Sequence, residues 1–176
     1  TAVKDIQIRP AGEQDFDAMW SIFCAHVAAG ETYPFTTATS REAGHAYWLG
    51  PEVTAFVATS GARVLGMYRL VPNQVGRGHH VANASYMVSP SAQGAGVGRL
   101  LGEHSLLEAR RLGYLAMQFN YVVSTNTAAI RLWKKLGFSI VGTLPKAYRH
   151  KRLGYVDAYV MYQLLQDPDH WPTVDA

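Results

Sequence analysis

The stretch of this chain best suited to bind an anion is the glycine-rich run at residues 93–98, Gln-Gly-Ala-Gly-Val-Gly. It lies between a predicted strand and a leucine-rich predicted helix, and no acidic residue follows it until Glu103. At a strand-to-helix junction, bare backbone N–H groups and the helix dipole converge on one point, and phosphate is the usual ligand there. The run therefore predicts a phosphate-binding turn, and a plain flexible turn is the structural alternative.

The spacing of the glycines excludes two large classes of phosphate loop. A Walker loop requires a lysine and a hydroxyl residue after its last glycine, whereas Arg99 and Leu100 follow Gly98. A dinucleotide fingerprint, Gly-x-Gly-x-x-Gly, would place Arg99 or Leu101 at its third glycine, and the acid expected further along is absent. The phosphates must belong to another kind of ligand.

Two segments resemble motifs of the GCN5-related N-acetyltransferases. The run at 93–98 resembles the family's Gln/Arg-x-x-Gly-x-Gly/Ala loop, and residues 126–138 match Asn-x-x-Ala-x-x-Leu-Tyr-x-Lys-x-Gly-Phe at nearly every position. The resemblance covers about residues 4–165 and implies acetyl-coenzyme A (acetyl-CoA) as the donor. The positions that it assigns to the donor are Met87, Val88, Gln93, Gly94, Ala95, Gly96, Val97, Gly98, Arg99, Asn126 and Ala129.

The resemblance also implies how the donor is held. The amides of residues 93–98 would face the pyrophosphate, and the backbone of Met87 and Val88 would pair with the pantetheine arm like an added strand. Three basic side chains are candidates for the outer phosphate of the nucleotide, or else form a solvated helix face: Arg131, Lys134 and Lys135.

Acetyl transfer to an amine requires a base, because an ammonium must lose a proton before it attacks. The family often places a carboxylate on the strand before the loop, but residues 79–88 contain no Asp or Glu. Tyr86, His80, Glu31 or a water held by the backbone are the alternatives, and the sequence does not choose among them.

The proton donor for the leaving thiolate also departs from the family pattern. Trp133 stands where the resemblance would place a tyrosine, and its indole N–H does not titrate in the useful range. We expect Trp133 to pack against the sheet, and Tyr121 or Ser124 to be available near the thiolate.

Two asparagines lie inside predicted strands, where asparagine is depleted. Asn83 and Asn120 would lie on neighbouring strands, so they are either satisfied core amides or part of a polar acceptor pocket closed by residues 31–35. Neutral polar groups with aromatic ones suit a small zwitterion. We therefore expect a small amine acceptor, such as an amino acid, an imino acid or a related antimetabolite, that attacks directly in a ternary complex. The chain also resembles the phosphinothricin-type branch of the superfamily.

Two other functions stay open. An acetyl-CoA-binding sensor without turnover would have the same loop, and a protein or peptide N-acetyltransferase would differ only in its acceptor groove.

The elements that must position these residues follow from hydrophobic periodicity and turn signals. Strands are expected at 4–10, 53–59, 63–71, 81–88 and 114–123. Another strand is expected to begin with residues 139–144, and the last one, 155–165, to pair back with it across a basic turn at 149–154. Helices are expected before Gly30, after a cap at Ser40, over 97–112 and before Gly137. This order predicts an α/β fold with a mixed, mostly antiparallel sheet, whose central parallel pair, 81–88 and 114–123, splays apart and is flanked by helices.

The composition limits the number of domains and the kinds of partner that we expect for this chain. The chain has 176 residues, of which 48% are hydrophobic and 16% charged, so we expect a single domain over 1–176. A net charge of +3 is too small to indicate nucleic-acid binding, and Cys24 has no disulfide partner within the chain. We expect a cytoplasmic protein with no metal site and no membrane segment. By analogy alone, a homodimer is possible.

Overall fold

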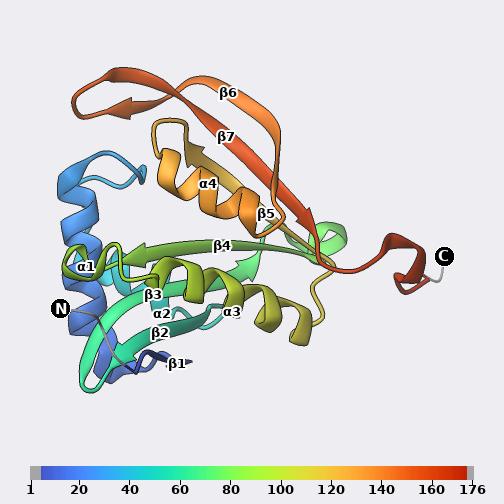
Figure 1. Cartoon of the computed structure of the whole chain (residues 1–176), viewed down its shortest axis with the longest axis horizontal. Coiled ribbons are helices and arrows are strands. Elements are labelled where there is room, and N and C mark those ends of the chain that lie inside the picture. Colours follow the sequence, from blue (N-terminus) through green and yellow to red (C-terminus); the bar gives the residue numbers. More distant parts are fainter. Residues whose placement is uncertain (1–4, 174–176) are drawn as a thin grey trace.

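The computed structural model describes residues 5–173, which form one seven-stranded sheet covered by helices on both faces (Figure 1). The strand order is β1-β2-β3-β4-β5-β7-β6. The strands are β1 (Gln7–Pro10), β2 (Thr54–Ser60), β3 (Arg63–Pro72), β4 (Val81–Val88), β5 (Ala116–Val123), β6 (Ser139–His150) and β7 (Gly154–Leu164). The helices are α1 (Phe16–Ala29), α2 (Arg41–Leu49), α3 (Val97–Arg111) and α4 (Thr127–Lys135).

The predicted parallel pair is confirmed. β4 and β5 run parallel, and every other pairing in the sheet is antiparallel. Their register covers three residue pairs, ending at Asn83 opposite Gln118, although both strands continue for several residues beyond that point. The two strands therefore separate in the middle of the sheet, as the resemblance implied.

The helix boundaries follow the local signals in the sequence. The Ser40 hydroxyl accepts a hydrogen bond from the Ala43 amide at 3.1 Å and so caps α2. Gly30 ends α1 in the left-handed region at φ +65°, where glycine is the favoured residue. These caps orient the α1–α2 loop, which reaches the open side of β4.

Two hydrophobic cores lie on opposite faces of the sheet. One core packs α3 and α4 against Tyr86, Met117 and Phe119, and the other packs α1 and α2 against Val57, Met67 and Met87. Alternation along β4 assigns its residues to the two faces, with Tyr86 facing α3 and Met87 facing α1.

Most predicted boundaries lie within one residue of those in the structure, and the larger differences are at β1, β5 and β6. The first strand begins at Gln7, and Lys4 lies outside the described residues. β5 begins at Ala116 and not at 114. The basic segment after residue 148 is only partly a turn, because β6 continues to His150 by pairing Arg149 with Tyr155 of β7. Pairing between strands extended β6 beyond the point where its apolar pattern stops.

Candidate functional site

A cavity of about 690 Å³ opens where β4 and β5 separate. Its walls come from α1, the α1–α2 loop, α2, β4, the glycine run, β5 and α4. Among the described residues that line it there is no Asp, Glu, Lys or Arg. The cavity therefore offers neutral polar groups, aromatic rings and main-chain amides rather than charged side chains.

The glycine run lies at one end of this cavity. Gly94 and Gly96 have φ values of +80° and +81°, and a Cβ added to either would meet nothing within 4 Å. The N–H groups in the first turn of α3 have no helical acceptor, so the turn presents unpaired donors to open space. This geometry fits a pyrophosphate. The predicted residues that line the cavity here are Gln93, Gly94, Gly96, Val97 and Gly98.

Two predicted donor-binding residues lie elsewhere. The Ala95 amide donates to the Ala92 carbonyl at 3.3 Å, so it is turned into the loop rather than outward. The Arg99 Nε donates to Glu103 Oε1 at 2.7 Å, and both residues line a separate cavity of about 390 Å³.

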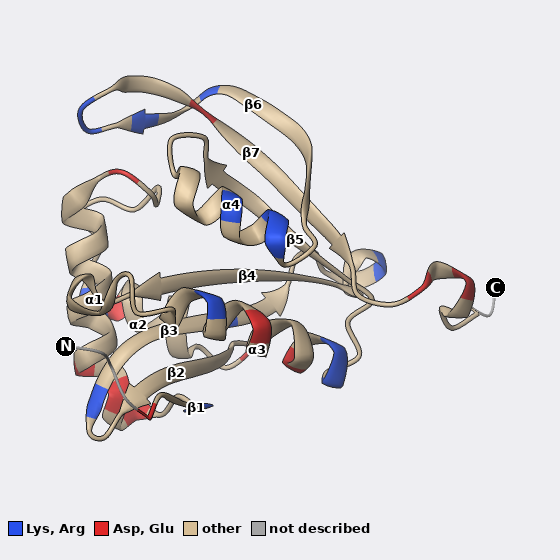
Figure 2. Ribbon diagram, in the orientation of Figure 1, with Lys and Arg blue, Asp and Glu red and all other residues tan. Residues whose placement is uncertain are grey.

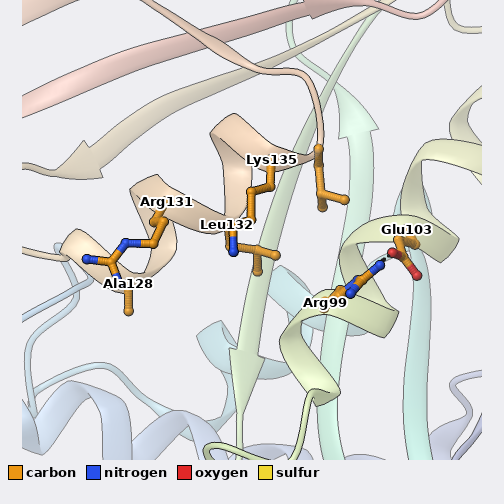
Figure 3. Close-up of a pocket in the computed structure, with 7 residues that line it drawn as sticks. Arg99, Glu103, Ala128, Arg131, Leu132 and Lys135 are labelled. Carbon is orange, nitrogen blue, oxygen red and sulfur yellow. Dashed lines mark hydrogen bonds and ion pairs between the residues drawn. The ribbon is translucent and has the colours of Figure 1, made fainter.

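This smaller cavity lies between α3 and α4 (Figure 3). Arg131 and Lys135 of α4 line it opposite Arg99, whereas Lys134 does not line it. Figure 2 shows basic residues along α4 on this side of the molecule. Two of the three candidates for the outer phosphate therefore share one depression with Arg99.

The backbone of β4 faces the cavity through alternate residues. The Tyr33 hydroxyl accepts from the Tyr86 amide at 3.1 Å and donates to the Tyr86 carbonyl. His26 Nε2 lies 2.7 Å from the Val88 carbonyl oxygen, which makes the imidazole the donor. The backbone groups of Tyr86 and Val88 belong to the edge of β4 with which β5 no longer pairs.

Of the two strand residues predicted to face the pantetheine arm, only Val88 lines the cavity. Met87 is 1% exposed, and its carbonyl oxygen would lie 2.9 Å from a Cβ added to Gly66 of β3. Alternate residues of a strand direct their backbone groups to opposite neighbours, so those of Met87 are directed to β3. The prediction for Met87 is therefore corrected.

Tyr86 is not placed to exchange a proton with an acceptor. Its ring lines the cavity, but its hydroxyl lies 2.6 Å from the Ser105 hydroxyl on α3 and points to Met117 Sδ. Burial raises the pKa of this phenol far above its ordinary value. The structure therefore does not support Tyr86 as the base.

The prediction that Glu31 belongs to the site is also corrected. Its Oε1 forms an ion pair with the Arg152 guanidinium at 2.7 Å, at the tip of the β6–β7 hairpin, and Glu31 does not line the cavity. The rest of the 31–35 stretch does close the cavity, since Thr32, Tyr33, Pro34 and Phe35 line it. His80, the remaining candidate side chain, is exposed and packs near Trp171.

The two predicted asparagines meet at the cavity. Asn83 donates from Nδ2 to the Gln118 carbonyl at 3.0 Å. Asn120 accepts from Gln118 Nε2 at 2.9 Å and donates to Asn73 Oδ1 at 2.7 Å. Both line the cavity, so they form part of a polar wall.

The remaining predicted residues lie on the α4 side. Asn126 caps α4 by accepting from the Ala129 amide at 3.4 Å, and both residues line the cavity. Trp133 packs against Tyr86 with ring centroids 4.6 Å apart, which is the packing role expected for it. The Tyr121 hydroxyl donates to the Ala147 carbonyl on β6.

Sequence reasoning missed five residues of this region. His26 falls within the apolar pattern of α1, and Tyr47 within that of α2, so neither had a local signal. Asn73 and Gln118 became notable only through their bonds to Asn120. Arg69 did have a signal, because it is a charged residue inside the apolar strand 63–71.

Comparisons with known proteins agree with this geometry. Residues 17–138 match the model of the acetyltransferase (GNAT) family, which is more than half of the chain. A solved GCN5-related N-acetyltransferase from Kribbella flavida is 41% identical, with a TM-score of 0.86 over 90% of this chain and 97% of that one. A ribosomal-protein-alanine N-acetyltransferase from Brucella melitensis is 26% identical, with a TM-score of 0.81 over 90% of this chain and 99% of that one.

Among curated proteins, the N-acetyltransferase aca1 of Schizosaccharomyces pombe is 40% identical over 113 residues, which is 64% of this chain and 51% of aca1. The chain thus spans about half the length of aca1. Within residues 5–173, no helix has the length and apolar content to cross a membrane. The family match covers the glycine run, both separated strands and α4. The chain therefore belongs to the acetyltransferase (GNAT) family, the enzymes that take an acetyl group from acetyl-CoA.

Proposed function

We propose that this chain is an N-acetyltransferase that moves the acetyl group of acetyl-CoA to the amine of a small molecule that also carries a carboxylate. The class comprises amino acids, imino acids and related antimetabolites, as acted on by a phosphinothricin-type branch of the family. The observation that carries this proposal is the lining of the cavity, which combines amides and aromatic rings and has no carboxylate among its described residues. A basic peptide tail would be bound better by acidic groups.

Acetyl-CoA would supply the activated thioester, and this chain's residues would hold it at one end of the cavity. The amides of Gly94, Gly96 and Val97 fit the pyrophosphate, because open space and unpaired donors coincide there. Arg131 and Lys135 fit the outer phosphate of the nucleotide. The edge of β4 at Tyr86 and Val88, with which β5 does not pair, fits the pantetheine arm. To bind there, the arm would replace or share the hydrogen bonds that the Tyr33 and His26 side chains form with the backbone of Tyr86 and Val88.

Asn83 and Asn120 would bind the acceptor at the other end. Each amide still has hydrogen-bonding capacity after the bonds described above, because an asparagine offers two N–H donors and two acceptor lone pairs. In the reaction the neutral amine forms a bond to the thioester carbon, the carbon–sulfur bond breaks, and the thiolate leaves. No carboxylate lines the described cavity, so a water held by these amides is the route that we propose for the amine proton.

The test is release of free thiol from acetyl-CoA in the presence of a panel of amines. The panel contains amino acids, imino acids, phosphinothricin and basic peptides at matched concentrations. We expect turnover with the small zwitterions and little with the peptides. A preference for basic peptides would contradict the proposal and favour the protein acetyltransferase.

The sensor alternative has a different signature. If calorimetry detects acetyl-CoA binding but no amine in the panel releases thiol above the uncatalysed rate, the chain binds the donor without using it. That outcome would end the proposal for an enzyme acting on small amines.

A further inference from the structure

Arg69 is a cationic side chain that stacks on Tyr47, a residue of the cavity wall, although Arg69 is not itself among the residues that line the cavity. It lies on β3 directly opposite Ser85 of β4. In the same register Met67 pairs with Met87, and both face α1 and α2, so by alternation Arg69, Ser85 and Asn83 share that face of the sheet. Arg69 is only partly buried.

The guanidinium has no counterion within residues 5–173. No salt bridge in this part of the chain includes Arg69, and its Nε is buried without a hydrogen-bond partner. The guanidinium carbon instead lies 3.8 Å from the centroid of the Tyr47 ring. A stacked aromatic ring stabilises a cation by about 0.5–2 kcal/mol but accepts no conventional hydrogen bond from the N–H donors of the guanidinium. Arg69 therefore has unused hydrogen-bonding capacity and a positive charge that no carboxylate within residues 5–173 neutralises.

The neighbours of Arg69 connect it to the cavity. The Tyr47 hydroxyl lies 2.6 Å from the Ser85 hydroxyl, and both residues line the cavity. Asn83, two residues before Ser85, lines it as well. Arg69 thus lies against the wall to which the acceptor would be bound, and the lining of that wall contains no carboxylate that would compete for it.

We propose that Arg69 binds the carboxylate of the acceptor and thereby makes the enzyme selective for amino and imino acids over simple amines. This inference rests on the proposed function. The planar guanidinium can donate two parallel hydrogen bonds to a carboxylate, which fixes the orientation of the acceptor as well as its affinity. With its carboxylate held beside Tyr47 and Ser85, the acceptor would direct its amine towards the separated strands.

The experiment compares acceptors in pairs: an amino acid that the enzyme uses, and the carboxamide of the same amino acid. The ratio of their kcat/KM values is measured for the wild type, Arg69→Met and Arg69→Lys. We expect Arg69→Met to lower kcat/KM for the amino acid about 10- to 100-fold, mainly through KM, because a charge-assisted hydrogen bond is lost. We expect the carboxamide to change by less than about threefold, and Arg69→Lys to keep part of the preference, because it keeps the charge but not the planar fork.

Arg77→Met is the matched control, because Arg77 is exposed and lines neither cavity. Arg77→Met removes the same charge and should leave the ratio of kcat/KM between amino acid and carboxamide unchanged. Circular dichroism and calorimetry with acetyl-CoA establish that each variant is folded and binds the donor. Should Arg69→Met not fold, Arg69→Lys still tests the proposal, since an unchanged KM for the amino acid in that variant would overturn it.

The outcomes separate the two proposals. Absence of turnover with every small amine in the wild type overturns the proposed function itself. Turnover in which the wild type uses amino acid and carboxamide equally overturns only the carboxylate site. An equal loss for both acceptors in folded Arg69→Met also overturns it, because Arg69 would then act only by supporting Tyr47.

Discussion

At the residue scale, the end of the cavity where we propose that the acceptor binds contains amide side chains that hold one another in place. Gln118 bonds to both asparagines, through its carbonyl to Asn83 and through its side chain to Asn120, and Asn73 holds the far side of Asn120. Asn120 also lies where the pairing of β5 with β7 is interrupted, between Phe119 and Val122. An amide at such an irregularity is free to face the cavity rather than the ladder.

Substitution of Asn120 should therefore affect the acceptor and not the donor. We predict that Asn120→Ala raises the acceptor KM about 10-fold, because one bound polar contact is lost, and leaves the Kd for acetyl-CoA within about twofold. Steady-state kinetics and calorimetry measure the two quantities. A large loss of donor binding in this variant would show that β5 had been assigned the wrong role.

The Tyr86 hydroxyl gives the opposite expectation. Because it bonds to Ser105 and lies among apolar residues facing α3, Tyr86→Phe should leave turnover within about threefold of the wild type and lower the free energy of unfolding by about 1 kcal/mol. Urea denaturation and the thiol-release assay measure both effects. If turnover by the folded variant were slower by about two orders of magnitude, Tyr86 would again be a candidate for proton transfer.

At the scale of the element, the turn between β4 and α3 depends on backbone conformation more than on side chains. Gly94 and Gly96 both adopt the left-handed conformation with space in front of them, so they bring main-chain donors to the open cavity. A side chain at either position would cost strain and would also stand where the phosphates are proposed to lie.

We predict that Gly96→Ala lowers the free energy of unfolding by about 1 kcal/mol and weakens acetyl-CoA binding at least 10-fold. The matched control is Gly61→Ala, because Gly61 also has a positive φ of +57° with open space around it, but lies in the β2–β3 turn. It should cost similar stability and leave donor binding unchanged. Equal donor affinity in the two variants would mean that residues 93–98 do not hold the pyrophosphate.

At the scale of the whole molecule, the cavity wall formed by the α1–α2 loop is held in place by segments far apart in the chain. The Tyr148 hydroxyl donates to the Tyr33 carbonyl at 3.1 Å, and the Lys151 amide donates to the Gly30 carbonyl at 3.0 Å. The β6–β7 hairpin, whose tip carries the basic residues seen in Figure 2, thus supports the α1–α2 loop that closes the cavity. The Glu31–Arg152 ion pair is one of these supports, which explains why Glu31 is not in the site.

The stability of the whole fold should depend on two carboxylates. A hydrogen bond from the Arg9 guanidinium lowers the pKa of Asp15, and one from Arg111 lowers the pKa of Glu108. A carboxyl group whose pKa is lowered by folding contributes stability above its unfolded pKa, near 4, and loses it as pH falls through the folded pKa. The free energy of unfolding should therefore decrease below about pH 4.

Urea denaturation at pH 7 and at pH 3 tests this expectation. The Asp15→Asn and Glu108→Gln double variant should be less stable than the wild type at pH 7 by about 1–3 kcal/mol, and its stability should change less between the two pH values. If the double variant and the wild type lose equal stability on acidification, other groups determine the acid sensitivity.

The sequence by itself determined the family, the order of the elements and the glycine turn, because those signals depend on neighbouring residues. Apolar periodicity, caps such as Ser40 and the spacing of glycines all act within a few positions of the chain. The same locality explains why β4 and α3 were expected at nearly the bounds that they have.

Only the tertiary structure decided which side chains enter the site. Tyr86 and Met87 are adjacent in the chain, yet the pleat of β4 directs the Tyr86 hydroxyl to Ser105 and the Met87 carbonyl to β3. Glu31 forms an ion pair with Arg152, which is distant in the sequence, and therefore does not line the cavity. Arg69 became notable because it has no counterion within residues 5–173 and its Nε has no hydrogen-bond partner. Partners that fold in from remote segments set these outcomes, so local patterns could not show them; for Arg69 the sequence showed only that a charged residue lies inside an apolar strand.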